Sequence, residues 1–420
     1  MWYSNLYRRF LCDMHIEDIR EEFMAEFSPE EFVENLKKAN INYAMYYAQS
    51  HVGLCYYPTK TGVMHKALRG REDLMRRVET LCHENGIKVI TYYSLIFNTR
   101  EHDRHPEWRM ITDNGQSRRE RGNMPSDGLA FASKQMSRYG LCCPNNGDYT
   151  KFVLAQIDEI LEYFDTDALF FDMPFWPWPA TCFCDSCRER WAREVGGDIP
   201  NTPKAGTKEW LTLTHKRYEW MGEWTRMIYD HIKAKDPDMT VEYNLASMVA
   251  GSSSNGCGLE VNAASDYCGG DIYGDIYNHS FVSKFYKNAT KNPPFEFMIS
   301  RCKLALRAHT LTKTVDELKT SVALTAAHHG ASLVIDAIDP VGTLDSRVYD
   351  RIGEAYRFIE PYEPYFRGKM AEDVGVYYGI KSRLDLYAIK FNSLDGNAGI
   401  AHSLIRGHIP FGVTCASYEL

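Results

Sequence analysis

The sequence predicts a (β/α)8 TIM barrel, an α/β fold, followed by the start of a second α/β domain. Segments typical of strands and of helices alternate from residue 9 to about residue 360, which is the order of a parallel sheet with crossover helices. The alternation gives eight strand and helix pairs, the number that closes a barrel. We expect the barrel over residues 1–369 and an incomplete second domain over residues 370–420.

The first four strands are predicted from short apolar runs bounded by turn or capping residues. A capping box, Ser28 to Glu31, begins the first helix, and Gly86 allows the left-handed end of the second helix. Apolar residues at helical spacing indicate a third helix over residues 148–164. The strands are expected at Arg9 to His15, Ile41 to Ala48, Ile87 to Ser94 and Ala168 to Asp172.

The second half repeats the pattern. Helical stretches around residues 187–195 and 208–235 precede the fifth strand, and a second capping box begins at Thr314. Strands five to eight are expected at Thr240 to Asn244, Asp266 to Tyr273, Phe295 to Ser300 and Ala331 to Asp336. Beyond Gly368 the sequence predicts one more strand, Asp373 to Tyr378, and one more helix, Asn397 to Arg406.

Composition excludes several classes of protein. No apolar run approaches the roughly 20 residues that span a bilayer, so we expect no membrane association. The net charge of −8 argues against a nucleic-acid surface, which needs a basic stripe. The first residues lack a basic segment followed by an apolar one, which predicts a cytoplasmic protein. The 27 tyrosines and 8 tryptophans suit a surface that binds carbohydrate.

Polar side chains stand where the predicted strands end. In a TIM barrel these ends form the functional face, and a sugar needs directional hydrogen-bonding groups beside an aromatic ring. The candidates for substrate binding at the strand ends are His15, His51, Tyr92, Tyr93, Asn244 and Arg301, and Trp176 and Trp178 follow the fourth strand as stacking candidates.

Asp172 is the main catalytic candidate. It ends the apolar run 168–171 and precedes an aromatic loop, so a carboxylate would stand at the barrel mouth. The alternative to a catalytic role is a structural one, in which Asp172 caps a helix or forms a buried salt bridge with an arginine such as Arg301. A retaining glycosidase needs a second carboxyl about 5 to 5.5 Å away. Asp271 is the first choice for it because it ends strand six, and Glu260 and Asp275 are the other options.

Four cysteines form a candidate metal site. Cys182, Cys184 and Cys187 follow the fourth strand in a C-x-C-x-x-C pattern, and Cys143 follows the third. Four thiolates suit structural zinc. The alternative is a set of reduced thiols, because a cytosolic chain keeps cysteines reduced. No cofactor for catalysis is expected.

Three segments resemble the α-L-fucosidases of glycoside hydrolase family 29. They are residues 48–53 with 57–60 (AQSHVG and YPTK), 86–94 (GIKVITYYS) and 169–172 (LFFD). The resemblance implies that Asp172 attacks the anomeric carbon and that His15 and His51 hold sugar hydroxyls. The chain departs from the family beside His51, where a second histidine and an aspartate are expected but Ser50 and Val52 stand.

The cysteine pattern is similar to that of the zinc-binding β-galactosidases of family 42. The resemblance implies a glutamine-amidotransferase-like trimerisation domain behind the barrel, beginning at residues 370–420, and hence a homo-oligomer, a trimer or a dimer. The acid/base Asn-Glu pair of that family is absent at strand four. As a whole the chain resembles glycosyl-hydrolase-like barrels with a trimerisation-type second domain, to which some α-L-fucosidases of family 151 are similar.

These observations predict a retaining, exo-acting glycoside hydrolase that removes a terminal sugar, α-L-fucose-like by resemblance, through a covalent intermediate on Asp172. One alternative is a barrel that binds carbohydrate without cleaving it, because no glutamate stands clearly at a strand end. The other is a metal-dependent barrel hydrolase, which would want paired histidines after strand one, where only His15 is present.

Overall fold

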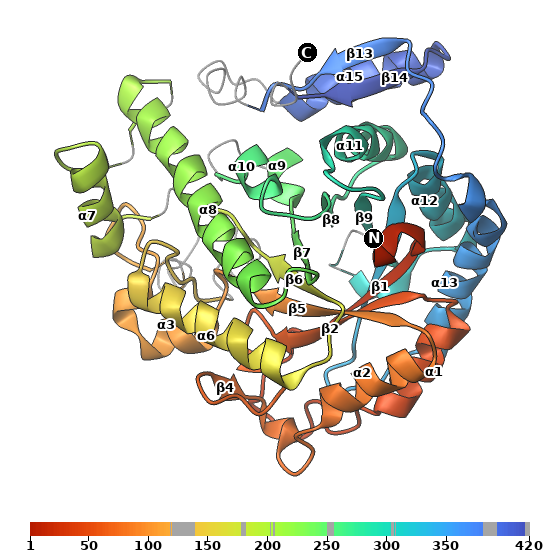
Figure 1. The fold of residues 1–420 in the computed structure, drawn as a ribbon, viewed down its shortest axis with the longest axis horizontal. Helices are drawn as coiled ribbons and strands as arrows, with labels where there is room; N and C mark the ends of the chain where they lie inside the picture. Colours follow the sequence, from red (N-terminus) through yellow and green to blue (C-terminus); the bar gives the residue numbers. More distant parts are fainter. Residues whose placement is uncertain are drawn as a thin grey trace.

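The barrel is present in the protein's structure, a computed structural model (Figure 1). The structure describes residues 1–117, 119, 139–177, 182–201, 203–204, 206–249, 256–303, 306, 308–380 and 393–415. Eight parallel strands form the wall: β1 (Arg8–Asp13), β2 (Tyr43–Gln49), β5 (Lys88–Ser94), β6 (Ala168–Asp172), β7 (Thr240–Tyr243), β8 (Gly269–Asp271), β9 (Glu296–Ser300) and β12 (Ala331–Ala337).

The strands pair in the order β7-β6-β5-β2-β1-β12-β9-β8, and every pair along this path is parallel. The two ends of the path meet at one parallel bridge between Asn244 and Gly269. There the Leu245 amide also donates to the Gly269 carbonyl at 2.8 Å. The ring is therefore nearly closed, and this short contact between β7 and β8 joins the two ends of the strand order.

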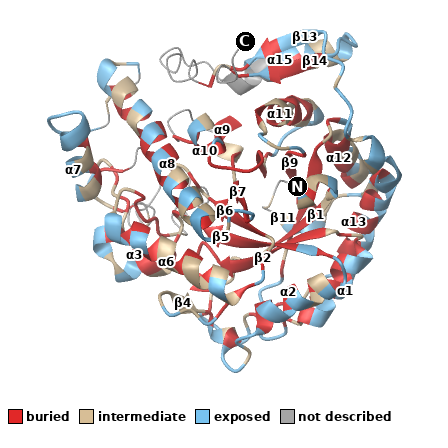
Figure 2. Ribbon diagram, in the orientation of Figure 1, coloured by how far each residue is buried: buried red, intermediate tan, exposed pale blue. Residues whose placement is uncertain are grey.

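Helices surround the wall with their buried sides inward (Figure 2). The longer ones are α1 (Pro29–Lys38), α2 (Leu74–Glu84), α6 (Gly147–Tyr163), α7 (Asp185–Glu194), α8 (Lys208–Lys235), α11 (Ile276–Ala289), α12 (Val315–Ala327) and α13 (Ser346–Ile359). The predicted caps are present: Ser28 accepts from the Glu31 amide, and Thr314 and Glu317 form a capping box. Short helices α3 (Thr99–Arg104), α9 (Ala246–Val249) and α10 (Leu259–Asn262) lie in the loops.

The interior of the barrel contains a buried ion pair. Arg9 Nη1 lies 3.0 Å from Glu296 Oε2, and both side chains are fully buried. Glu242 Oε2 accepts a hydrogen bond from the Tyr267 hydroxyl at 2.7 Å, and the Arg9 guanidinium faces the Tyr267 ring. Burial, followed by the charge of Glu296, raises the pKa of Glu242 well above its usual value. Because Arg9, Glu242 and Glu296 come from strands that are not neighbours, they meet across the interior and fill it.

Strand six is shorter than predicted. The expected Asp266 to Tyr273 contains only β8, of three residues. Its two glycines lie against β7 and the loop after it: a Cβ on Gly269 would come within 2.4 Å of Glu242 Oε1, and one on Gly270 within 2.6 Å of the Ala246 nitrogen. Only glycine permits this close approach to β7. For this reason only three residues of the segment pair as a regular strand.

The small sheets were not predicted, whereas a strand and a helix were predicted after the barrel and are present. Two short strands, β3 (Leu54–Cys55) and β4 (Val63–Met64), extend the sheet at β2, and β10 (Cys302–Lys303) pairs with β11 (Ala308–Thr312). After the barrel, β13 (Val374–Tyr377) pairs in parallel with a further strand, β14 (Phe411–Thr414), and α15 (Ser393–Arg406) lies between them in the chain. The prediction missed β14, because four residues that include a glycine carry little strand signal. This unit lies beside α11 (Figure 1), and Asn288 of α11 donates to the Val413 carbonyl.

Among the helices of the described ranges, none combines the length and the apolar character needed to cross a bilayer.

Candidate active site

Asp172 ends β6, and its carboxylate receives three hydrogen bonds. The Tyr92 hydroxyl donates to Oδ2 at 2.5 Å, and the Asn244 side-chain amide and the Met173 backbone amide donate to Oδ1, each at 2.8 Å. Only 7% of the residue is exposed. Burial, followed by the charge of Asp271, raises the pKa of Asp172 to about 7, although the three donors oppose this shift.

The same amide joins Asp172 to Asp271. Asn244 Nδ2 donates to Asp172 Oδ1 at 2.8 Å and to Asp271 Oδ1 at 2.9 Å, so one –NH2 group bridges two carboxyls. Because both oxygens bond to one nitrogen, they can be no more than about 5.7 Å apart, close to the spacing of retaining glycosidases. Burial raises the pKa of Asp271 as well, and hydrogen bonding to Asn244 and Tyr273 opposes it.

His51 faces the other oxygen of Asp172, with Nε2 3.6 Å from Oδ2. Ser94 donates its hydroxyl proton to the Phe97 carbonyl, so the 2.6 Å contact between His51 Nδ1 and Ser94 Oγ requires a proton on Nδ1. In neutral His51 the lone pair of Nε2 therefore faces Asp172. Because a lone pair and a carboxylate oxygen repel each other, the contact between His51 Nε2 and Asp172 Oδ2 is favourable only with one more proton, on His51 or on Asp172.

His15 lies flat against His51, with ring centroids 3.7 Å apart. The backbone amide of His51 donates to His15 Nδ1 at 3.1 Å, which leaves the proton of neutral His15 on Nε2. That nitrogen lies 3.5 Å from Asp13 Oδ1 and 3.3 Å from the Tyr47 hydroxyl. Both histidines thus belong to one hydrogen-bonded group that reaches Asp172.

Tyr47, Asp13 and Ser94 belong to this group. Asp13 and Ser94 stand at predicted strand ends, whereas sequence reasoning did not single out Tyr47. The Tyr47 ring stacks on Tyr92 at 3.9 Å, and its hydroxyl lies 3.4 Å from Asp13 Oδ1. Strand periodicity could have identified Tyr47, because Tyr46 points outward to Glu79 of α2 and its neighbour must face inward.

The structure places other predicted residues away from the cluster. Tyr93 alternates with Tyr92 and therefore faces outward, where its hydroxyl donates to Gln156 of α6 at 2.7 Å. Trp176 is buried against α8, with Nε1 donating to the Arg217 carbonyl at 2.8 Å, and so has no open face for a sugar. Trp178 lies outside the described residues.

Arg301 is also engaged elsewhere. Its Nε lies 2.5 Å from Asp336 Oδ1, in a buried ion pair between the ends of β9 and β12. The structural alternative for Asp172, a salt bridge to Arg301, is therefore wrong. The candidates that do meet are Asp172, Asp271, Asn244, Tyr92, His51 and His15.

The four cysteines form a second cluster. The sulfur atoms of Cys143, Cys182, Cys184 and Cys187 all lie within 4.8 Å of one another, and all four residues are buried. Four sulfurs around a tetrahedral zinc ion, each about 2.3 Å from the metal, would be about 3.8 Å apart. The described cluster has this spacing and composition and could hold a metal ion.

Residues 28–173 match the family described as hypothetical glycosyl hydrolase 6. The matched segment contains β2, β5 and β6 and ends one residue after Asp172, so it includes His51 and Tyr92. No curated protein matches the chain.

Solved structures of two kinds of glycosidase share the fold. The α-L-fucosidase isoenzyme 2 from Paenibacillus thiaminolyticus aligns with a TM-score of 0.79 at 20% identity, covering 99% of this chain and 58% of that one. A β-galactosidase from Rahnella sp. R3 aligns with a TM-score of 0.73 at 14% identity, covering 99% and 66%. A catalytic mutant of Gan42B, a GH42 β-galactosidase from G. stearothermophilus, aligns with a TM-score of 0.70 at 12% identity, covering 99% of this chain and 66% of that one.

The chain therefore spans about three fifths to two thirds of the length of these structures. At such identities the likeness shows the fold, a TIM barrel, and the matched family is glycosyl-hydrolase-like.

Proposed function

We propose that the protein is a retaining, exo-acting glycoside hydrolase in which Asp172 is the nucleophile and Asp271 the acid/base. The observation that carries this proposal is the bridge of Asn244 between the two carboxyls. It keeps the two Oδ1 atoms within about 5.7 Å of each other, below the roughly 6.5 to 9.5 Å between the carboxyls of an inverting enzyme, which admit a water molecule.

The electrostatics of the pair support a division of roles. Burial raises both pKa values, and the charge of Asp271 raises that of Asp172 further, so near neutral pH the pair retains a proton. Asp172 receives three hydrogen bonds, which stabilise a negative charge and suit a nucleophile. In the free protein Asp172, whose pKa is raised to about 7, holds part of this proton, and the mechanism places it on Asp271 in the reacting complex, where it serves as the acid of the first step.

The reaction follows from these positions. Asp172 attacks the anomeric carbon, the glycosidic bond breaks, and the departing oxygen takes the proton of Asp271. Asp271 then removes a proton from water, which attacks the same carbon and releases Asp172. His51, His15 and Tyr92, which surround Asp172, are placed to hold the hydroxyls of the sugar.

For the substrate we propose a terminal α-L-fucose-like sugar. The support is the fold shared with the Paenibacillus α-L-fucosidase, together with the histidines beside Asp172. The small exposed fraction of Asp172 suits a pocket that admits one terminal ring rather than a groove for a long chain.

Asp271→Asn tests the acid/base role. With an aryl α-L-fucoside of poor leaving ability we expect kcat/KM to fall by about 10² to 10⁴, because the departing oxygen loses its acid. With a dinitrophenyl leaving group, which needs no proton, the first step should stay fast and release a burst of phenol. The measurement is stopped-flow absorbance across a panel of aryl glycosides.

Azide provides the control for that experiment. In Asp271→Asn it should restore turnover and yield a glycosyl azide of retained configuration, because it attacks the covalent intermediate. Equal losses with both leaving groups would refute the acid/base assignment, and silence of the wild-type protein on every sugar would favour a barrel that binds carbohydrate without cleaving it.

For the cysteine cluster we propose structural zinc. Cys143→Ser is expected to lower the zinc content from about one ion per chain to near zero and to lower the melting temperature by several degrees, because three thiolates hold zinc poorly. Cys142→Ser is the matched control: Cys142 is equally buried, but its sulfur contacts the Asn98 carbonyl instead. Metal analysis and thermal unfolding measure both, and a zinc content unchanged by Cys143→Ser would contradict the proposal.

A further inference from the structure

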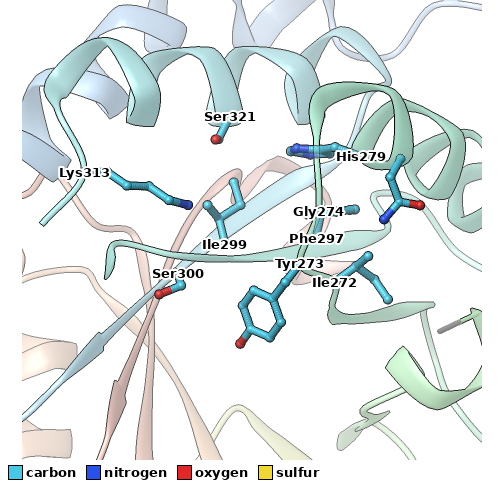
Figure 3. A pocket seen from close by; sticks show the side chains of 10 residues that line it. Ile272, Tyr273, Gly274, His279, Phe297, Ile299, Ser300, Lys313 and Ser321 are labelled. Atoms are coloured by element: carbon cyan, nitrogen blue, oxygen red, sulfur yellow. The ribbon is translucent and has the colours of Figure 1, made fainter. Parts of the chain in front are cut away.

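A cavity of about 300 Å³ lies at the loop that follows Asp271, between the ends of β8 and β9 and helices α11 and α12 (Figure 3). Its size is at the lower end of small-molecule sites and would hold one sugar ring. Lys313 and Ser321 reach into it from one side, and Tyr273 lies on another (Figure 3). The lining residues are Ile272, Tyr273, Gly274, Asn278, His279, Phe297, Ile299, Ser300, Lys313 and Ser321.

Lys313 gives the cavity its charge. Among the ten described residues that line it, Lys313 is the only lysine or arginine, and none is acidic. The nearest acidic influence on Lys313 comes from Glu317, but that carboxylate is paired with Lys303 at the surface. Burial lowers the pKa of Lys313, so the ammonium is partly desolvated and gains from a negatively charged ligand.

His279 adds no second charge. Thr325 gives its hydroxyl proton to the Ser321 carbonyl, so the 2.8 Å contact between His279 Nε2 and Thr325 Oγ1 is a donation from the imidazole. Burial lowers the pKa of His279 to about 3, so the ring is neutral. Stacked on Phe297 at 3.8 Å, it provides a flat wall on one side of the cavity.

The position of the cavity assigns it to one side of the scissile bond. Tyr273, which lines it, follows Asp271 by two residues, and hydrogen bonding to Tyr273 lowers the pKa of that carboxyl. In the proposed mechanism Asp271 delivers its proton to the departing oxygen. A cavity that is connected to Asp271 through Tyr273 is therefore placed to receive the leaving group.

We propose that this cavity is the leaving-group subsite and that it binds a sugar carrying an anionic substituent, a carboxylate or a sulfate, through Lys313. The hydroxyls of Ser300 and Ser321 and the amide of Asn278 supply polar contacts for the same ring. The inference rests on the proposed function, because the leaving-group side is defined by the role of Asp271.

Binding can be tested without turnover. Isothermal titration of the wild-type protein with glucuronate, with glucose 6-sulfate and with glucose compares the two anionic groups with a neutral ring. We expect at least one anionic sugar to bind about 10- to 100-fold more tightly than glucose, the gain of a charge-assisted hydrogen bond. The stronger of the two identifies the substituent.

Substitutions assign the effect to one ammonium. Lys313→Met should remove the preference for the anionic sugar, and Lys313→Arg should retain most of it. Lys319→Met is the matched control, since Lys319 is a lysine of α12 that is paired with Glu354 and does not line the cavity, and it should leave the preference unchanged. Thermal unfolding of each variant verifies that it is folded.

The outcomes separate the two proposals. An anionic preference that survives Lys313→Met, or no preference in the wild-type protein, overturns the subsite. If the preference depends on Lys313 but no aryl glycoside is cleaved, the anion site is supported and the hydrolase proposal fails.

Discussion

Asp172→Asn is expected to lower kcat for an aryl α-L-fucoside by at least about a thousandfold, the largest loss of activity among single substitutions in this protein. The amide keeps the shape of the side chain but cannot form the covalent bond to the anomeric carbon. The measurement is steady-state release of phenol, with azide rescue giving a glycosyl azide of inverted configuration. Tyr93→Phe is the control and should leave the rate unchanged, because Tyr93 faces α6.

The stability of the same variant verifies that Asp172 is buried and protonatable. Its pKa of about 7 in the folded state exceeds the unfolded value of about 3.9, so the folded protein binds the proton more tightly. The contribution of Asp172 to wild-type stability must therefore fall as pH rises from about 4 to 7, whereas asparagine does not titrate. We expect the free energy of unfolding of Asp172→Asn, relative to wild type, to increase over that range. A difference that is constant with pH would contradict this account.

Arg9→Met is expected to lower the free energy of unfolding by about 3 to 5 kcal/mol, the largest loss of stability. It leaves Glu296 fully buried without its cation, beside Glu242. The loss should be smaller at acid pH, where both glutamates are protonated. Urea unfolding at pH 5 and pH 8 measures it.

A double variant isolates the charge from the packing. In Arg9→Met with Glu296→Gln the carboxylate that was paired with Arg9 is gone, and most of the lost stability should return. A loss below about 1 kcal/mol in Arg9→Met alone would show that water reaches this part of the barrel interior.

Much of the fold was predictable because each strand is a short apolar run between capping signals. The ends of β6 and β9 were predicted to the residue, and the capping boxes at Ser28 and Thr314 mark helices that are present. The C-x-C-x-x-C pattern with Cys143 predicted a cluster because the loops after strands three and four are neighbours in a barrel.

The remainder depends on facts that a single sequence does not contain. Whether Tyr92 or Tyr93 faces the interior depends on strand register, and a one-residue change reverses the answer. In the sequence Trp176 lies in an aromatic loop and looks like a stacking residue. Only its packing against α8 shows that its ring is covered. The ion pair of Arg301 with Asp336 joins strands that are adjacent only after the barrel closes.

Asn244 has two roles, one carried by its backbone and one by its side chain. Its backbone forms the bridge to Gly269 that completes the circle of strands, and its side chain holds Asp172 and Asp271 at their spacing. A substitution that moves β7 and β8 apart at this bridge, such as one that places a side chain on Gly270, would also increase the distance between the nucleophile and the acid. Asn244 therefore both joins the two ends of the strand ring and sets the spacing of the two carboxyls.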